Sequence, residues 1–331
     1  MRSPRLAFAA IACFFALSAL GSPFIGQIAI PVSDLISGEG TARAVFFELR
    51  VPRVLAALLA GGALSLSGVA FQALFRNPLA APFTLGVSSG AGLGASLYVR
   101  LGLAITIAGV SGIALAAFAG AAGAMLLVYG LARARGSLAS NTLLLAGVAI
   151  SFTCSSLILF VQYTADLYDS FRMLRWMMGG LGVVGYADLR TLAPFALGGG
   201  AVILLLRREL DLLLTGEELA QARGLDIART QTLLFFAVSF MVGGVVAVCG
   251  PIGFIGLIAP HVARLLVGHS HRWLAPAAML FGAGFLALSD AVARTVFAPA
   301  EIPVGVLTAM LGGPFFLLLL LTRGPGFTGN R

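Results

Sequence analysis

Side chains that could perform acid–base, nucleophilic or metal chemistry are few in this 331-residue chain, and they do not form a catalytic set. The three histidines are His261, His269 and His271, and the H-S-H spacing of the last two is too short to place two metal ligands on one helix face. Three cysteines lie in separate apolar runs without CxxC or zinc-ligand spacing. The sequence therefore predicts no enzymatic activity, no metal site and no cofactor in this chain. An intramembrane hydrolase, which needs a base and a nucleophile or metal ligands at one depth, is disfavoured.

Arginine is the residue type that could still bind other groups. All 21 basic residues are arginine, and the chain contains no lysine. The phosphate-binding loop of common ATPases requires a lysine after its glycines, so any ATP hydrolysis must come from a separate subunit. A guanidinium binds a carboxylate through two parallel hydrogen bonds. Because the arginines are dispersed between apolar segments, we do not expect nucleic-acid binding.

The elements that must position these residues are apolar helices. Hydrophobic residues make up 59% of the chain and charged residues 10%, against about 25% charged in soluble domains. We expect an all-α integral membrane protein forming one transmembrane domain over 1–331, because helices satisfy their own backbone in lipid. The first helix resembles a signal peptide but lacks an A-x-A-like site before a soluble domain, so we expect it to be retained. About ten spans are expected, at 6–30, 52–73, 83–101, 104–131, 141–163, 191–207, 230–249, 253–268, 273–297 and 304–322.

Charge and glycine patterns refine this arrangement. With both termini in the cytoplasm, thirteen arginines fall inside and eight outside, which agrees with the positive-inside bias. Gly86, Gly90 and Gly94 recur at every fourth position, a spacing that allows helix backbones to approach closely in lipid.

The stretch 207–230, RRELDLLLTGEELAQARGLDIART, carries nine charges between oily segments. Thr215 and Glu218 match a capping box, and we expect a helix over 216–223 that ends at a left-handed Gly224. Asp226 then predicts the N-cap of a helix beginning at Ile227. The sequence thus predicts a compact cytoplasmic protrusion. It is either a solvated loop or a docking surface for a partner that hydrolyses ATP.

Seven stretches of the chain resemble one known family. The FecCD permeases, which are the membrane subunits of type II ABC importers for iron chelates, haem and vitamin B12, share these stretches in the same order over about four fifths of the chain. The stretches are LRVPRVLAALLAGGALSLSG, FQALFRNPLAAPFTLGVSSGAGLGA, LLLAGVAI, RWMMGG, GEELAQARGL, GPIGFIGLIAPHVARLLVG and EIPVGVLTAMLGGPFF.

The resemblance implies a vitamin B12 importer-like permease fold in the bacterial inner membrane. It implies a homodimer with the pathway at the two-fold interface, two ATP-binding-cassette subunits inside that bind ATP and magnesium, and a periplasmic binding protein outside. It also implies that cytoplasmic coupling helices at about 209–228 sit in the ATPase. The coupling residues would be Thr215, Gly216, Glu217, Glu218, Leu219, Ala220, Ala222, Arg223 and Gly224.

Three arginines match the outer docking positions of the family. Arg50 and Arg53 lie at the mouth of the second span and Arg294 lies at the end of the ninth, where carboxylates of the binding protein would meet them. Snorkelling to the lipid interface is the alternative for all three. Asp290, one turn before Arg294, is a further alternative partner for that residue.

The resemblance also assigns a cytoplasmic gate at the start of the fifth span. Ser140 and Asn141 match it, and helix N-capping is the alternative role of both residues.

RWMMGG, which follows the fifth span, is expected near the outer half of the pathway. Met177 and Met178 would give the pathway a soft lining or would pack in the core. Arg172 and Arg175 are hypothesised to attract an anionic chelate or haem propionates.

The remaining alternative is an ion-coupled secondary transporter, which usually needs several buried acids. Asp290 is the only carboxylate well inside a predicted span, and pairing with Arg294 explains it more simply. Among cargoes we place ferric siderophores first, with vitamin B12 and haem next.

Overall fold

The computed structural model describes residues 4–28, 30–37, 41–134, 140–182 and 185–322, and it is helical almost throughout. The helices are α1 Pro4–Gly21, η1 Ser22–Phe24, α2 Val32–Ser37, α3 Thr41–Ala44, η2 Val45–Arg50, α4 Val51–Leu74, η3 Pro82–Leu85, α5 Val87–Arg100, α6 Gly112–Ala134, α7 Ser140–Tyr163, α8 Leu167–Met177, α9 Ala187–Leu205, α10 Arg207–Leu213, α11 Glu217–Ala222, α12 Ile227–Cys249, α13 Ile255–Val267, α14 His271–Thr295 and α15 Val304–Thr322. The strands are β1 Thr106–Ile107 and β2 Val110–Ser111, paired antiparallel.

Each predicted span contains a helix, which confirms the all-α membrane fold. Within the described residues, seven helices are long and apolar enough to cross a bilayer, and α13 and α15 add shorter apolar helices. The third predicted span holds α5, which has only 14 residues.

Two predicted boundaries were wrong. The first helix ends at Gly21 rather than at residue 30, because Pro23 and a 3₁₀ turn follow it. The fourth span begins at Gly112 rather than at residue 104, because residues 106–111 form the β1–β2 hairpin.

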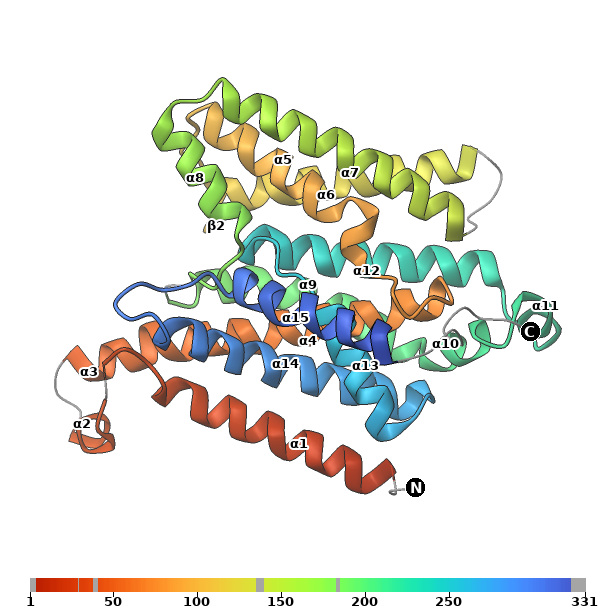
Figure 1. The fold of residues 1–331 in the computed structure, drawn as a ribbon, viewed down its shortest axis with the longest axis horizontal. Coiled ribbons are helices and arrows are strands. Elements are labelled where there is room, and N and C mark those ends of the chain that lie inside the picture. Colours follow the sequence, from red (N-terminus) through yellow and green to blue (C-terminus); the bar gives the residue numbers. More distant parts are fainter. Residues whose placement is uncertain (1–3, 29, 38–40, 135–139, 183–184, 323–331) are drawn as a thin grey trace.

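The helices form a layered bundle around α4 (Figure 1). Neighbouring layers contact in the order α1, α14, α4, α9 with α12, α6, α5 and α7. The most apolar stretch of α4 is 83% buried, more than that of any other candidate span in the described chain. Small residues permit this packing, because a Cβ at Gly61 or Gly68 would collide with the carbonyl oxygen of Gly282 or Gly256. Helix α4 is therefore the centre of the bundle.

The predicted glycine contact is confirmed for two of its three members. A Cβ at Gly90 would lie 2.5 Å from the carbonyl oxygen of Gly120, and one at Gly94 would collide with that of Ala116. Both contacts join α5 to α6. Gly86 instead precedes α5 with φ of +83°, a left-handed conformation that favours glycine.

Candidate functional site

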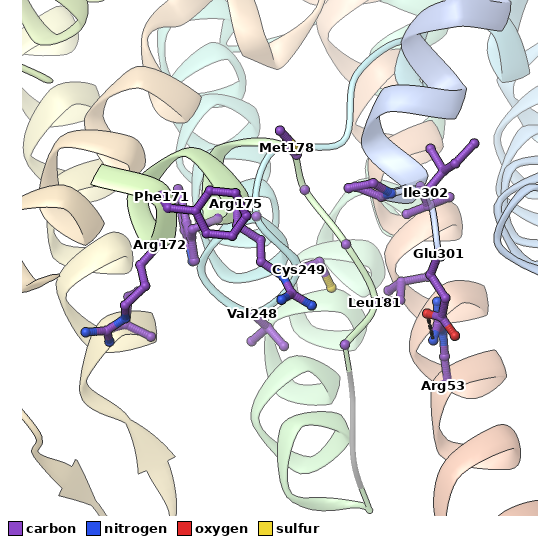
Figure 2. A pocket seen from close by; sticks show the side chains of 18 of the residues that line it. Arg53, Phe171, Arg172, Arg175, Met178, Leu181, Val248, Cys249, Glu301 and Ile302 are labelled. Atoms are coloured by element: carbon purple, nitrogen blue, oxygen red, sulfur yellow. Dashed lines mark hydrogen bonds and ion pairs between the residues drawn. The ribbon is translucent and has the colours of Figure 1, made fainter. Parts of the chain in front are cut away.

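A cavity of about 630 Å³ opens at one end of the bundle, opposite the end that carries α10 and α11 (Figures 1 and 2). Its walls come from the start of α4, from α8, from the loop 178–182, from the end of α12 and from the segment 301–304. Figure 2 shows Arg172 and Arg175 on one side of the cavity and the pair Arg53 and Glu301 on the other, with Cys249 between them. The cavity thus presents cationic groups around an apolar and glycine-rich floor.

Helix α8 positions the first two arginines. Asp166 caps this helix by accepting a hydrogen bond from the Asp169 backbone N–H at 2.7 Å. Arg172 and Arg175 are three residues apart, so both side chains fall on one face of the helix, toward the cavity. Arg172 also pairs with Asp169 at 3.5 Å and lies over the ring of Tyr168.

The two methionines of RWMMGG separate. Met178 lines the cavity (Figure 2), whereas Met177 ends α8 and its sulfur accepts a weak hydrogen bond from the Gln162 amide at 3.8 Å. The loop then lies against α12 and α15, because the Gly180 N–H donates to the Cys249 carbonyl at 2.8 Å and the Gly305 N–H to the Gly179 carbonyl at 3.2 Å. The loop, the end of α12 and the start of α15 therefore form one wall.

An ion cluster lies beside the opposite wall. Arg53 donates to both oxygens of Asp290 at 3.0–3.2 Å through Nε and Nη2. Its Nη1 turns toward the cavity and lies 2.9 Å from Glu301. Arg294 Nε lies 3.1 Å from Asp290, which confirms the predicted i,i+4 pair, and Arg294 also donates to the Ser22 carbonyl. Asp290 is 1% exposed and is shared between two guanidinium groups in the protein interior, and Glu301 supplies the second negative charge of the cluster.

The three arginines predicted for docking occupy different environments. Arg50 is buried and donates to the backbone carbonyls of Pro23 and Ile28. Arg294 is also buried, so neither residue extends to the lipid interface as the snorkelling alternative requires. Arg53, with 17% of its side chain exposed, is the member of the three that reaches the cavity.

The protrusion predicted within the stretch 207–230 extends from the other end of the bundle, and its residues 207–226 are called the knob below (Figure 1). It consists of α10, a turn, α11 and a second turn leading into α12. Gly224 has φ of +82°, and the Asp226 carboxylate accepts from the Arg229 N–H at 3.0 Å, so both local predictions are confirmed.

The capping box was wrong. Gly216 occupies the N-cap of α11 with φ of +107° and without a side-chain cap, so the helix spans Glu217–Ala222 rather than 216–223. The Thr215 hydroxyl turns back and donates to the Leu212 carbonyl at 2.8 Å. It satisfies the last turn of α10 instead of the first turn of α11.

Most predicted coupling residues of the knob are on its surface. Glu217, Glu218, Leu219, Ala222 and Arg223 are exposed. The methyl group of Ala220, in contrast, is fully buried beneath α11 and contributes to the packing of the knob.

Two sets of contacts fix the knob to the membrane helices. Arg76, just beyond α4, donates to the Leu213 carbonyl at 2.9 Å and lies 3.5 Å from Glu217. The carboxylate of Asp211, in α10, accepts from the His271 backbone N–H at 2.9 Å and lies 2.6 Å from its Nδ1. The knob is thus bonded to the end of α4 and to the start of α14. The same two helices carry the ion cluster at their opposite ends.

The sequence of this chain is similar to those of known transport proteins. The model of the FecCD transport family matches residues 11–322. The chain belongs to the FecCD transport family. The hemin transport system permease of Yersinia pestis is 37% identical over 97% of this FecCD chain and 96% of its own length. The vitamin B12 import system permease of Klebsiella pneumoniae is 42% identical over 91% of this chain and 89% of its own.

A solved structure extends the likeness to three dimensions. A chain assigned to a metal-chelate type ABC transporter, in an inward-facing conformation, superposes with a TM-score of 0.86 at 33% identity, over 97% of this chain and 100% of that chain. This FecCD chain therefore has the predicted ABC permease fold.

Helix α7 begins at the predicted gate residues, Ser140 and Asn141, at the same end of the FecCD bundle as the knob (Figure 1). The Asn141 side chain is exposed. The side chain of Ser140 lies outside the described residues, so the choice between gate and N-cap stays a prediction.

Glu301, Arg76 and Asp211 are site residues that sequence reasoning missed. EIPVG of the FecCD-like stretch contains Glu301, and nine clustered charges include Asp211. Each pairs with a residue far away in the chain, for example Glu301 with Arg53. Local spacing cannot indicate such pairs.

Proposed function

We propose that this FecCD chain is the membrane-spanning permease subunit of an ATP-driven importer, and that its cargo is a metal chelate. The observation that carries the proposal is that hydrogen bonds attach the knob to two membrane helices. A polar helix–turn–helix is fixed by Arg76 to α4 and by Asp211 to α14. A lysine-free chain cannot supply a common phosphate-binding loop, so the energy of ATP hydrolysis would enter from a separate ATPase through the knob.

The surface of the knob fits a coupling role. The ATPase would contact the exposed Glu217, Glu218, Leu219 and Arg223. Force on α11 would pass through the 2.6 Å Asp211–His271 contact into α14 and through Arg76 into α4. Because both helices are closely packed, they would shift as units and alter the cavity at their far ends.

Further partners follow from exposed surfaces and from the family. Large apolar side chains of α7 and α15, among them Phe152, Phe160 and Leu317, are 72%, 64% and 64% exposed. These surfaces would face the lipid bilayer and a second copy of the chain, with the pathway between the two subunits. The knob and both termini would lie in the cytoplasm of a bacterial cell, in its inner membrane. A periplasmic binding protein would dock at the cavity end, where the ion cluster lies.

The cavity supports an anionic cargo. Its volume of about 630 Å³ lies within the range of small-molecule sites. Arg172 and Arg175 would attract carboxylates or phosphates on the cargo. The apolar and glycine-rich lining would bind the cargo weakly, so that a large chelate is not retained. Ferric siderophores remain our first candidates, and the hemin and vitamin B12 relatives support those two cargoes.

Uptake into vesicles tests the proposal. The chain would be reconstituted with its cognate ATPase and binding protein, and accumulation of ⁵⁵Fe-siderophore, cyanocobalamin or hemin would be measured with ATP inside. We expect uptake that requires ATP and that is lost when residues 209–228 are replaced by a glycine–serine linker.

Uptake driven by a proton or sodium gradient in the absence of ATP would support the secondary transporter instead. No contact of the buried Asp290 favours that alternative, because its charge is already neutralised by Arg53 and Arg294.

A further inference from the structure

Glu301 forms the second ion pair of Arg53, and it supplies the negative charge that Asp290, shared between Arg53 and Arg294, cannot supply alone. The guanidinium of Arg53 already engages both oxygens of the buried Asp290 through Nε and Nη2. Its remaining Nη1 edge faces the cavity and holds Glu301 at 2.9 Å (Figure 2). Arg53 thus has one edge fixed in the interior and one edge presented to solvent.

The two carboxylates differ in how readily they can be exchanged. Asp290 is 1% exposed and lies on α14, so it cannot leave Arg53 without moving the core. Glu301 is 45% exposed and lies on the connection between α14 and α15. Exposed ion pairs contribute little to stability because water competes for both partners. The Arg53–Glu301 pair, called the latch below, is therefore weak and replaceable.

The latch also controls one wall of the cavity. The segment 301–304 lines it and leads directly into α15. The Ile302 N–H donates to the Ala293 carbonyl at 3.1 Å, and the Gln27 amide donates to the Pro299 carbonyl at 3.2 Å, so the segment keeps backbone anchors when Glu301 leaves. Opening the latch would let residue 301 move away from α4, while Ile302, the start of α15 and the rest of the connection stay attached.

We propose that Glu301 is an intrachain stand-in for a carboxylate of the docked binding protein. An incoming carboxylate takes the Nη1 edge of Arg53, displaces Glu301, and frees residue 301 so that the cavity widens toward the arriving cargo. Docking of the binding protein and opening of the cavity then occur in the same step, in which one carboxylate replaces another on the Arg53 guanidinium. This inference rests on the proposed function, in which a periplasmic binding protein docks at the cavity end.

The first test needs no partner. Cys249 lines the cavity and is 2% exposed, so its reaction rate with a small methanethiosulfonate reagent reports on access to the cavity. The permease–ATPase complex would carry Cys13→Ser and Cys154→Ser, leaving Cys249 as the single thiol of the permease chain, whose labelling is measured separately from that of the ATPase. We expect Glu301→Gln to raise the labelling rate about fivefold, the factor that corresponds to loss of one exposed pair. Glu48→Gln, which neutralises an exposed carboxylate at the same end of the bundle, is the matched control and should leave the rate unchanged.

The second test measures affinity for the cognate periplasmic binding protein, by biolayer interferometry on the complex in nanodiscs. Glu301→Gln should tighten binding about fivefold, because the Nη1 edge no longer has to be vacated. Arg53→Lys keeps the charge beside Asp290 but loses the planar fork, and it should weaken binding roughly tenfold. Folding of each variant is checked by gel filtration and by ATP hydrolysis.

The outcomes separate the two ideas. If Arg53→Lys binds the partner as tightly as the unmodified complex, docking at Arg53 is wrong and the latch fails with it. If Arg53→Lys weakens binding while Glu301→Gln changes neither affinity nor labelling of Cys249, docking stands and the latch is overturned. Weaker binding by Glu301→Gln also overturns it, because Glu301 would then contribute to the docking surface itself.

Discussion

Asp290→Asn is expected to destabilise this permease more than any other single neutralisation of a carboxylate described above. The substitution keeps the size of the side chain and removes its charge. Asp290 is 1% exposed and contacts Arg53 and Arg294, whose side chains are 17% and 5% exposed. Loss of the carboxylate charge would leave the buried Arg294 uncompensated and Arg53 with Glu301 alone. Arg50 bonds to the Pro23 carbonyl, beside the Ser22 carbonyl that Arg294 contacts.

The magnitude follows from burial. Breaking a buried ion pair by removing one partner costs about 3–5 kcal/mol. Because Arg53 retains some contact with solvent and keeps Glu301, we expect the lower part of this range, about 3 kcal/mol. Glu48→Gln, at an exposed carboxylate, should cost less than about 0.5 kcal/mol.

A double-mutant cycle isolates the reason. Arg294→Met alone removes one of the two cations, and the bidentate contact of Asp290 with Arg53 survives it. In the double variant Asp290→Asn/Arg294→Met one uncompensated guanidinium is absent. The stability lost in the double variant should therefore be smaller than the sum of the two single losses by about 1–3 kcal/mol.

The assay is the free energy of unfolding in mixed micelles titrated with sodium dodecyl sulfate, followed by circular dichroism. Equal stability of Asp290→Asn and the unmodified chain would refute the assignment of a neutralising role to Asp290. Strict additivity in the cycle would refute its coupling to Arg294.

Three further outcomes test other parts of the structure. Asp211→Ala removes the contacts with the backbone and ring of His271, and it should cost about 1 kcal/mol of stability as a lost helix cap. ATP hydrolysis by the complex should continue while uptake falls. Equal losses of hydrolysis and uptake would contradict a coupling role. Gly94→Leu places a side chain where α6 approaches, and it should reduce the yield of folded protein in gel filtration, a result that normal yield would exclude. Alanine at both Arg172 and Arg175 should slow uptake of an anionic chelate severalfold and spare a neutral one; equal rates for the anionic cargo would refute attraction by these side chains.

Features that depend on neighbouring residues were predictable from the sequence. Asp226 caps α12 and Gly224 adopts the left-handed turn because both effects act within a few residues. The same local argument failed at Thr215, because Gly216 offered the backbone a cap position that needs no side chain. The early end of α1 followed from Pro23, which the apolar run concealed.

Pairs across the bundle were beyond the reach of spacing. Arg53 and Asp290 are 237 positions apart, and only the packing of α4 against α14 brings them together. The sequence suggested Arg294 as the partner of Asp290, and that pair exists as well. The additional pair with Arg53 changes the role of Asp290, because its buried carboxylate now links α14 to α4.

Composition and local order by themselves determined that the chain is a helical membrane protein with a polar knob and without a phosphate-binding loop. Long apolar segments form helices in lipid, and a phosphate-binding loop needs a lysine. Both arguments follow from residue types alone and require no knowledge of distant contacts. Tertiary structure alone decided that the knob and the ion cluster lie at opposite ends of the same two helices, α4 and α14. Such contacts join residues that are remote in sequence, and their partners are selected by the packing of whole helices.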